Sequence, residues 1–110
     1  MLTFKYGEFA TNQVDALKEG LRKRIFFLIL LVDENTADNY KGVDVERTFE
    51  SFLAEFGSLN ELLGYPAEMV SILSLVNAAR LEYESSDFSW KRYRKYLLTA
   101  GSQAEKIKED

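Results

Sequence analysis

Residues 14–32 read VDALKEGLRKRIFFLILLV, and this stretch decides the fold. Its first half repeats apolar residues at spacings of three and four, as in an amphipathic helix that begins at Thr11 or Asn12. In the second half, Ile25 to Val32, apolar side chains point in every direction. A helix that is apolar all round must be surrounded by protein. This half is therefore either the central core helix or half of an interface.

Helical spacing continues along the rest of the chain. Asp44 caps a helix that Gly57 ends, and Ser58 with Glu61 has the spacing of a capping box, which predicts a short helical turn before Gly64. A further helix runs from Pro66 to about Glu84. A last helix, with Trp90, Tyr93, Leu97 and Ala100 on its buried face, follows a break at residues 85–87 and ends at Gly101. Residues 33–42 read as a loop.

The N-terminal residues alternate apolar and polar side chains, with Leu2, Phe4 and Tyr6 on one face of an extended segment. No second convincing strand is evident, so the segment is either an arm laid over the helices or an edge strand donated to another subunit. The sequence thus predicts an all-α fold: a compact bundle of four principal helices plus a short helical turn, with an N-terminal extended arm. The predicted divisions are an arm at 1–10, a helical domain at 11–101 and a polar C-terminal tail at 102–110.

Composition limits the classes of function. A chain of 110 residues with 46% hydrophobic residues can close one core, and a net charge of -4 does not favour nucleic acid as a partner. The apolar run from Ile25 to Val32 is far shorter than the ~20 residues of a membrane span. A signal-peptide interpretation would use Arg22–Arg24 as its basic flank, but no small-residue cleavage site follows. The absence of cysteine fits a reducing compartment, so we expect a cytoplasmic protein.

Catalytic and metal chemistry find few candidate residues. The chain has no histidine and no cysteine, so the usual general base, imidazole ligand and thiolate nucleophile are missing. Carboxylate pairs such as Glu46 with Glu50 are expected to point outward, and the six glycines are scattered singly rather than gathered in a phosphate loop. We therefore expect no enzyme activity, no cofactor, no metal site and no small-molecule substrate.

The segment 90–96 is the best candidate for nucleic-acid contact, because basic and aromatic residues alternate in it. Its candidate contact residues are Lys91, Arg92, Arg94 and Lys95. On a helix, however, the aromatic residues turn inward and the basic ones form an ordinary solvated face. Reversing the charge of Lys91, Arg92 and Lys95 is then expected to leave the melting temperature nearly unchanged.

The leading functional expectation is a non-catalytic protein-protein interaction module, such as an assembly or regulatory adaptor, that forms a homodimer. Its expected interface lies on the second half of the first helix, at Phe26, Phe27, Leu30 and Leu31. The competing interpretation is that bulky aromatic residues on the other helices enclose this stretch within one chain. A nucleic-acid-associated regulator that uses residues 90–96 is the alternative function.

Overall fold

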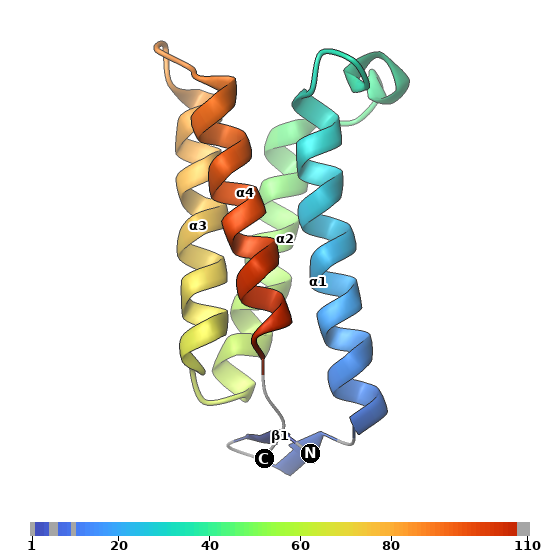
Figure 1. Ribbon diagram of the computed structural model, residues 1–110, viewed down its shortest axis with the longest axis vertical. Helices are drawn as coiled ribbons and strands as arrows, with labels where there is room; N and C mark the ends of the chain where they lie inside the picture. Colours follow the sequence, from blue (N-terminus) through green and yellow to red (C-terminus); the bar gives the residue numbers. More distant parts are fainter. Residues whose placement is uncertain (1, 5–6, 10, 108–110) are drawn as a thin grey trace.

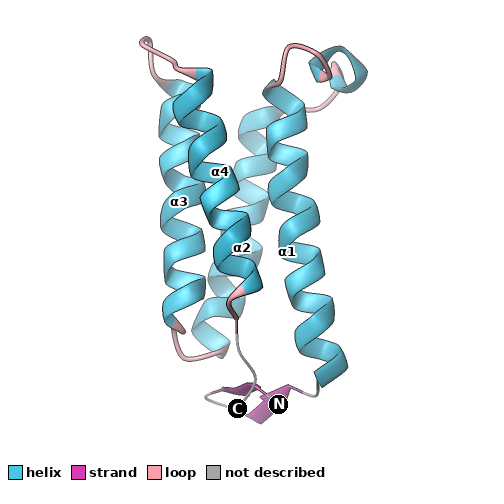
Figure 2. Cartoon of the chain, in the orientation of Figure 1, coloured by secondary structure: helices cyan, strands magenta, loops and turns pink. Residues whose placement is uncertain are grey.

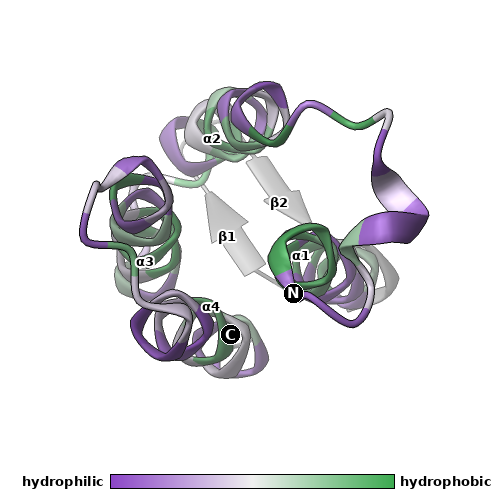
Figure 3. Ribbon diagram, turned by 90° about the horizontal axis from the view of Figure 1, so that it is seen from above, coloured by the Kyte–Doolittle hydropathy of each residue, from purple (hydrophilic) through white to green (hydrophobic). Residues whose placement is uncertain are grey.

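The computed structural model describes residues 2–4, 7–9 and 11–107. Four helices form a bundle: α1 (Thr11–Val32), α2 (Val45–Leu62), α3 (Ala67–Glu84) and α4 (Trp90–Glu105). They run alternately up and down, so that each helix is antiparallel to the next along the chain and α4 returns beside α1 (Figure 1). A view along the helices shows them at the corners of a square (Figure 3). The predicted all-α class with four principal helices is confirmed.

The N-terminal arm pairs with itself, in contrast to the prediction of a segment without a partner strand. Strands β1 (Leu2–Phe4) and β2 (Gly7–Phe9) form an antiparallel pair in which Leu2 faces Phe9. This hairpin lies across the end of the bundle where α1 begins (Figure 2). The prediction missed it because a three-residue strand that starts with glycine is too short to show an alternating pattern.

The short helical element lies between α1 and α2, and not at residues 58–64 as predicted. It is a single turn of 3-10 helix, η1 (Ala37–Tyr40), inside the segment that the sequence presented as a loop. The Thr36 hydroxyl donates a hydrogen bond to the Leu30 carbonyl (2.7 Å), which satisfies an otherwise unpaired group at the end of α1. The Asp44 carboxylate accepts the Arg47 N–H, so the predicted cap of α2 is confirmed.

Helix α2 continues through Gly57, which was predicted to end it. The apolar spacing does not break there: Phe52, Phe56, Leu59 and Leu63 keep one stripe against the core. A glycine inside a helix costs about 1 kcal/mol, whereas each large side chain buried beyond it contributes about 1.5–3 kcal/mol. The helix ends instead at Gly64, where φ is 80° and the N–H groups of Gly64 and Tyr65 bond back to Glu61 and Asn60.

Helix α4 likewise continues beyond its predicted end at Gly101. Ala104 and Ile107 are buried and extend the stripe of Leu97 and Ala100, so packing again outweighs one glycine. The first part of the predicted polar tail, residues 102–107, is therefore part of the packed domain. At the other end of α4, the N-terminal cap is Ser89, whose hydroxyl accepts the Arg92 N–H (3.3 Å).

The core is one continuous cluster along the bundle axis. Each helix contributes an inward stripe, and the largest fully buried side chains are Leu21, Leu28, Phe49, Met69, Ile72, Tyr93 and Leu97. The molecule measures 42 × 24 × 21 Å, so the bundle is elongated along its helices. Among the described residues, none of the helices is long and apolar enough to cross a membrane.

Candidate functional site

The four predicted interface residues of α1 do not form one exposed surface. Phe26 is 56% exposed, whereas Leu31 is buried. Phe27 is half-buried, with its ring edge-to-face against Tyr40 at 5.2 Å, and Leu30 is also half-buried. The buried residues of this half of α1 belong to the same core cluster as the aromatic residues Phe49, Phe52, Phe56 and Tyr93, and Tyr93 bonds to the Leu28 carbonyl. Enclosure within one chain thus describes most of residues 25–32, and of the four predicted interface residues Phe26 alone is exposed.

Phe26 lies on one wall of a groove between α1 and α4. Leu98, 44% exposed, lies on the other wall, and Ile25, Ile29 and Leu97 are also among its apolar lining residues. The groove has a volume of about 330 Å³. Arg22 and Glu105 also line it and form an ion pair (3.3 Å) across it. The groove can hold a small apolar side chain, but a charged pair must be displaced or accommodated to extend a contact along it.

The exposed face of α3 is a larger uncharged surface, which sequence reasoning missed. Val70 (44% exposed) and Leu81 (58% exposed) are its two large exposed apolar side chains. Between them this face, called the α3 face below, has small or uncharged side chains throughout, and its exposed members are Ala67, Val70, Ser74, Asn77 and Leu81. Leu73 and Ala78 are half-buried along its edges. At 100° per residue the five exposed members fall within about one quarter of the helix circumference.

Two cations near the α3 face, Arg80 and Arg92, are both held in ion pairs. Arg80 forms ion pairs with Glu46 of α2 (3.7 Å) and with Glu84 (3.3 Å). Burial and the nearby Glu84 carboxylate raise the pKa of Glu46, which the Arg80 charge partly offsets. Glu46 is thus part of an ion-pair network between α2 and α3. Its predicted outward carboxylate partner, Glu50, is exposed.

The other helices of the described segment expose charged residues. Exposed charged side chains are Asp15, Glu19, Arg22, Lys23 and Arg24 on α1, Arg47, Glu50, Glu55 and Glu61 on α2, and Lys91, Arg92, Arg94, Lys95 and Glu105 on α4. A solvated helix face normally carries such groups. The signal for the α3 face was present in the sequence, because no charged residue occurs from Met69 to Ala79, but spacing alone did not show which side faces outward.

The four predicted nucleic-acid contacts of α4 divide into two groups. Lys91, Arg94 and Lys95 are exposed, and within the described residues they make no ion pair. Arg92 instead holds the buried carboxylate of Glu82 on α3: its Nε and Nη2 both donate to that carboxylate, and Nη2 also donates to the Asp87 carbonyl (2.9 Å). Arg92 is exposed, as expected for a solvated face, and it also connects α4 to α3 through this ion pair.

The Arg92 contact sets the protonation of Glu82. The guanidinium hydrogen bonds hold the pKa of Glu82 below its ordinary 4.5, with a further contribution from the Ser89 N–H, which donates to the same carboxylate (3.2 Å). The carboxylate in turn raises the pKa of Arg92. The pair therefore stays ionised at neutral pH and fixes the loop between α3 and α4.

The aromatic residues of segment 90–96 do not form an open stacking platform. Tyr93 is fully buried, and its hydroxyl donates a hydrogen bond to the Leu28 carbonyl of α1 (2.6 Å). Burial raises the pKa of Tyr93 well above its ordinary value. Trp90 stacks on Tyr93 with ring centroids 5.8 Å apart, and both Trp90 and Tyr96 are half-buried. These rings fill the bundle, which leaves little free face for bases.

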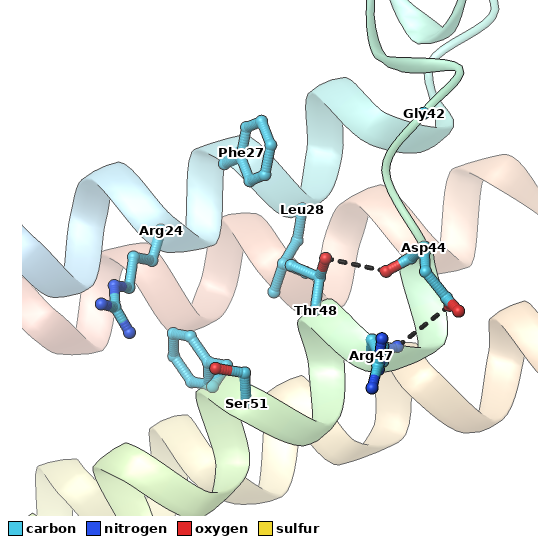
Figure 4. A pocket seen from close by; sticks show the side chains of 9 residues that line it. Arg24, Phe27, Leu28, Gly42, Asp44, Arg47, Thr48 and Ser51 are labelled. Carbon is cyan, nitrogen blue, oxygen red and sulfur yellow. Dashed lines mark hydrogen bonds between the residues drawn. The ribbon is translucent and has the colours of Figure 1, made fainter.

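A pocket between α1 and the first turns of α2 is lined by several polar side chains (Figure 4). Its volume is about 470 Å³, and Arg24 and Arg47 lie on opposite sides of it. The Thr48 hydroxyl donates to the Asp44 carbonyl, the Asp44 carboxylate accepts the Arg47 N–H, and Arg24 pairs with Glu55 over the Phe56 ring. These polar groups stabilise helices and surface, and they do not converge on a reacting atom.

Within residues 2–4, 7–9 and 11–107, no group of three or more Asp, Glu, His or Cys side chains is placed so that it could hold a metal ion. Comparison of the chain with protein-family models, with curated proteins and with solved structures gives no significant match. The site must therefore be judged on its own geometry.

Proposed function

We propose that this protein is a non-catalytic protein-protein interaction module, acting as an assembly or regulatory adaptor, and that it binds its partner through the α3 face. The observation that carries the proposal is the absence of charge along the exposed side of α3 between Ala67 and Leu81, where Val70 and Leu81 are the two large exposed apolar side chains. In contrast to the initial expectation, the proposed surface is on α3 and not on the second half of α1.

The energetics of such a face favour contact with protein. Fully burying a side chain of this type contributes about 1.5–3 kcal/mol, and Val70 and Leu81 are already partly covered, so each offers a fraction of that. No ionised group must be dehydrated between them, which removes the largest cost of forming an interface. The small side chains of Ser74 and Ala78 also permit another helix to approach closely.

A photo-crosslinking amino acid tests the proposal in cells that express the full chain. Placed at Leu81, it should give one discrete adduct with a protein. Placed at Glu50, which is exposed on α2 among other charged residues, it should give none. Absence of an adduct at Leu81, or the same mixture of many adducts at both positions, would contradict a binding function for the α3 face.

A nucleic-acid-associated regulator is the alternative, favoured by one observation: Lys91, Arg94 and Lys95 are exposed on one side of α4. Two other observations oppose nucleic-acid binding. Arg94 lines a cavity together with the acidic residues Asp33 and Glu34, and the neighbouring aromatic rings are packed inward. If the alternative holds, replacing these three cations by glutamine should abolish binding to a labelled duplex at 50 mM salt, while replacing Arg22 and Lys23 should not. A wild-type chain that binds no duplex at that salt concentration excludes it.

The proposal includes two further expectations about the protein's context. A cytoplasmic location rests on the cysteine-free sequence alone. A homodimer that pairs through the α3 face is the second expectation.

A further inference from the structure

We infer that the partner on the α3 face is a second copy of this chain, with the two α3 helices antiparallel about a two-fold axis between Ser74 and Asn77. This inference rests on the proposed function, since it names the occupant of the same face.

A two-fold interface opposes a surface with itself, so the surface must not carry an excess of one charge at its centre. Two copies, each with a net charge of -4, also repel one another. The exposed face of α2 carries Glu50, Glu55 and Glu61 beside Arg47, so a two-fold contact there would bring like charges close together. That of α4 would do the same with Lys91, Arg94 and Lys95. The exposed face of α3 from Val70 to Leu81 has no charged side chain, so it can meet its own image without dehydrating an ionised group.

The order of side chains along α3 is complementary to its reverse. An axis between Ser74 and Asn77 places Val70 of one copy opposite Leu81 of the other at both ends of the contact. It also places the Ser74 hydroxyl opposite the Asn77 amide, so that the two polar groups at the centre can donate to and accept from each other. The apolar ends are thus buried, and the polar centre keeps hydrogen-bond partners.

The ends of α3 favour the antiparallel direction over the parallel one. In the antiparallel pair, Glu84 at the end of α3 lies opposite Ala67 of the other copy, where the start of a helix carries partial positive charge. In a parallel pair, Glu84 would lie beside Glu84 of the other copy. The same helix dipoles attract when antiparallel and repel when parallel.

The contact is expected to be weak. The α3 face from Ala67 to Leu81 is about 20 Å long at 1.5 Å per residue. A single helix pair of this length buries less surface than a stable interface, which buries about 1,200–2,000 Å². Because the contact area is small, association must be measured over a concentration series that reaches high concentration.

Light scattering of the purified full chain is the first test. The mass should rise from 12.7 kDa towards twice that value as concentration increases. Leu81→Lys should weaken self-association at least tenfold without lowering the melting temperature. Leu98→Lys on α4 is the matched control, with a similarly exposed leucine in the α1–α4 groove, and should leave self-association unchanged. A constant monomer mass up to millimolar concentration, or loss of the dimer in the control variant, overturns the inference.

Disulfide trapping is the second test, and it reports direction, because the natural chain contains no cysteine. Ser74→Cys, close to the axis, should link to itself under mild oxidation. Leu81→Cys should not, since its own copy lies about 16 Å away along the helix, but it should link to Val70→Cys in a mixture. Self-linking of Leu81→Cys with no mixed product would indicate a parallel pair and contradict the proposed geometry.

The crosslinking experiment at Leu81 in cells separates this inference from the proposed function. An adduct with the mass of two copies supports both. A discrete adduct with one different protein, together with a purified chain that stays monomeric, supports the interaction module and overturns the dimer. No adduct overturns both.

Discussion

Helices α3 and α4 lie side by side, and each packs a fully buried stripe against the core, but their outer faces are opposite in character. The inner stripe of α3 contains Met69, Ile72 and Val76, and that of α4 contains Tyr93, Leu97 and Ala100. Outside, α3 has no charge for three turns, whereas α4 begins with four cations. The inner faces meet the same requirement for a dry core, so the outer faces are where the sequence is free to specify function.

The largest expected effect separates the two faces of α3. Ile72→Asp should unfold most of the protein at 25 °C, because an unpaired buried carboxylate costs several kcal/mol out of a typical stability of about 5–15 kcal/mol. Val70→Asp, two residues away but half-exposed, should change the free energy of unfolding by less than about 0.5 kcal/mol while it weakens self-association. Urea unfolding followed by circular dichroism measures both. A strongly destabilised Val70→Asp variant would show that the α3 face contributes to the fold itself.

A smaller effect is expected for the hydrogen bond that joins α4 to α1. Tyr93→Phe should lower the free energy of unfolding by about 1–3 kcal/mol, since it removes the donor to the Leu28 carbonyl and leaves the ring in place. Tyr96→Phe, in a half-buried position on the same helix, is the control. In the same assay it should change the free energy of unfolding by less than about 0.5 kcal/mol. Equal effects for the two variants would argue against this bond.

The raised pKa of Tyr93 adds a dependence on alkaline pH. A native state that holds the phenol protonated is stabilised below the ordinary pKa of 10.0 and loses that stability as pH rises beyond it. Wild-type stability should therefore fall more steeply above pH 10 than that of Tyr93→Phe. Parallel stability curves for the two proteins over that interval would contradict the assignment.

The smallest expected effect tests whether the four cations of α4 are equivalent. Arg92→Gln should lower the melting temperature by several degrees at pH 7, because it leaves the Glu82 carboxylate buried without its guanidinium. Arg94→Gln, at an exposed position with no ion pair among the described residues, should leave it unchanged. Because of this contact, we now expect the charge reversal at Lys91, Arg92 and Lys95 to lower the melting temperature through Arg92.

Acid provides the second readout for the same pair. A carboxylate whose folded pKa lies below its ordinary value of 4.5 stabilises the fold above that pH, and this contribution is lost as pH falls below it. The difference in melting temperature between wild type and Arg92→Gln should therefore shrink between pH 7 and pH 3. A difference that stays constant over this range would mean that Arg92 acts through packing and not through the ion pair.

Much of the fold could be predicted because inward stripes leave a periodic trace in the sequence. The four principal helices, the Asp44 cap and the stop at Gly64 were all visible as spacing or as turn residues. The errors at Gly57 and Gly101 share one cause: a local helix-breaking preference of about 1 kcal/mol was judged without the tertiary packing that outweighs it. The hairpin at β1 and β2 escaped because strands of three residues have almost no pattern.

The functional surface was less accessible from spacing alone. By itself the sequence determined an all-α domain with one core, without histidine or cysteine, and with a charge-free stretch from Met69 to Ala79. Only the tertiary structure decided which apolar residues stay outside, because burial depends on what the other helices cover. In the folded chain Leu31 is buried, Phe27 and Leu30 are half-buried, and Phe26 is exposed. Arg92 forms an ion pair with Glu82, and Val70 and Leu81 are exposed to solvent.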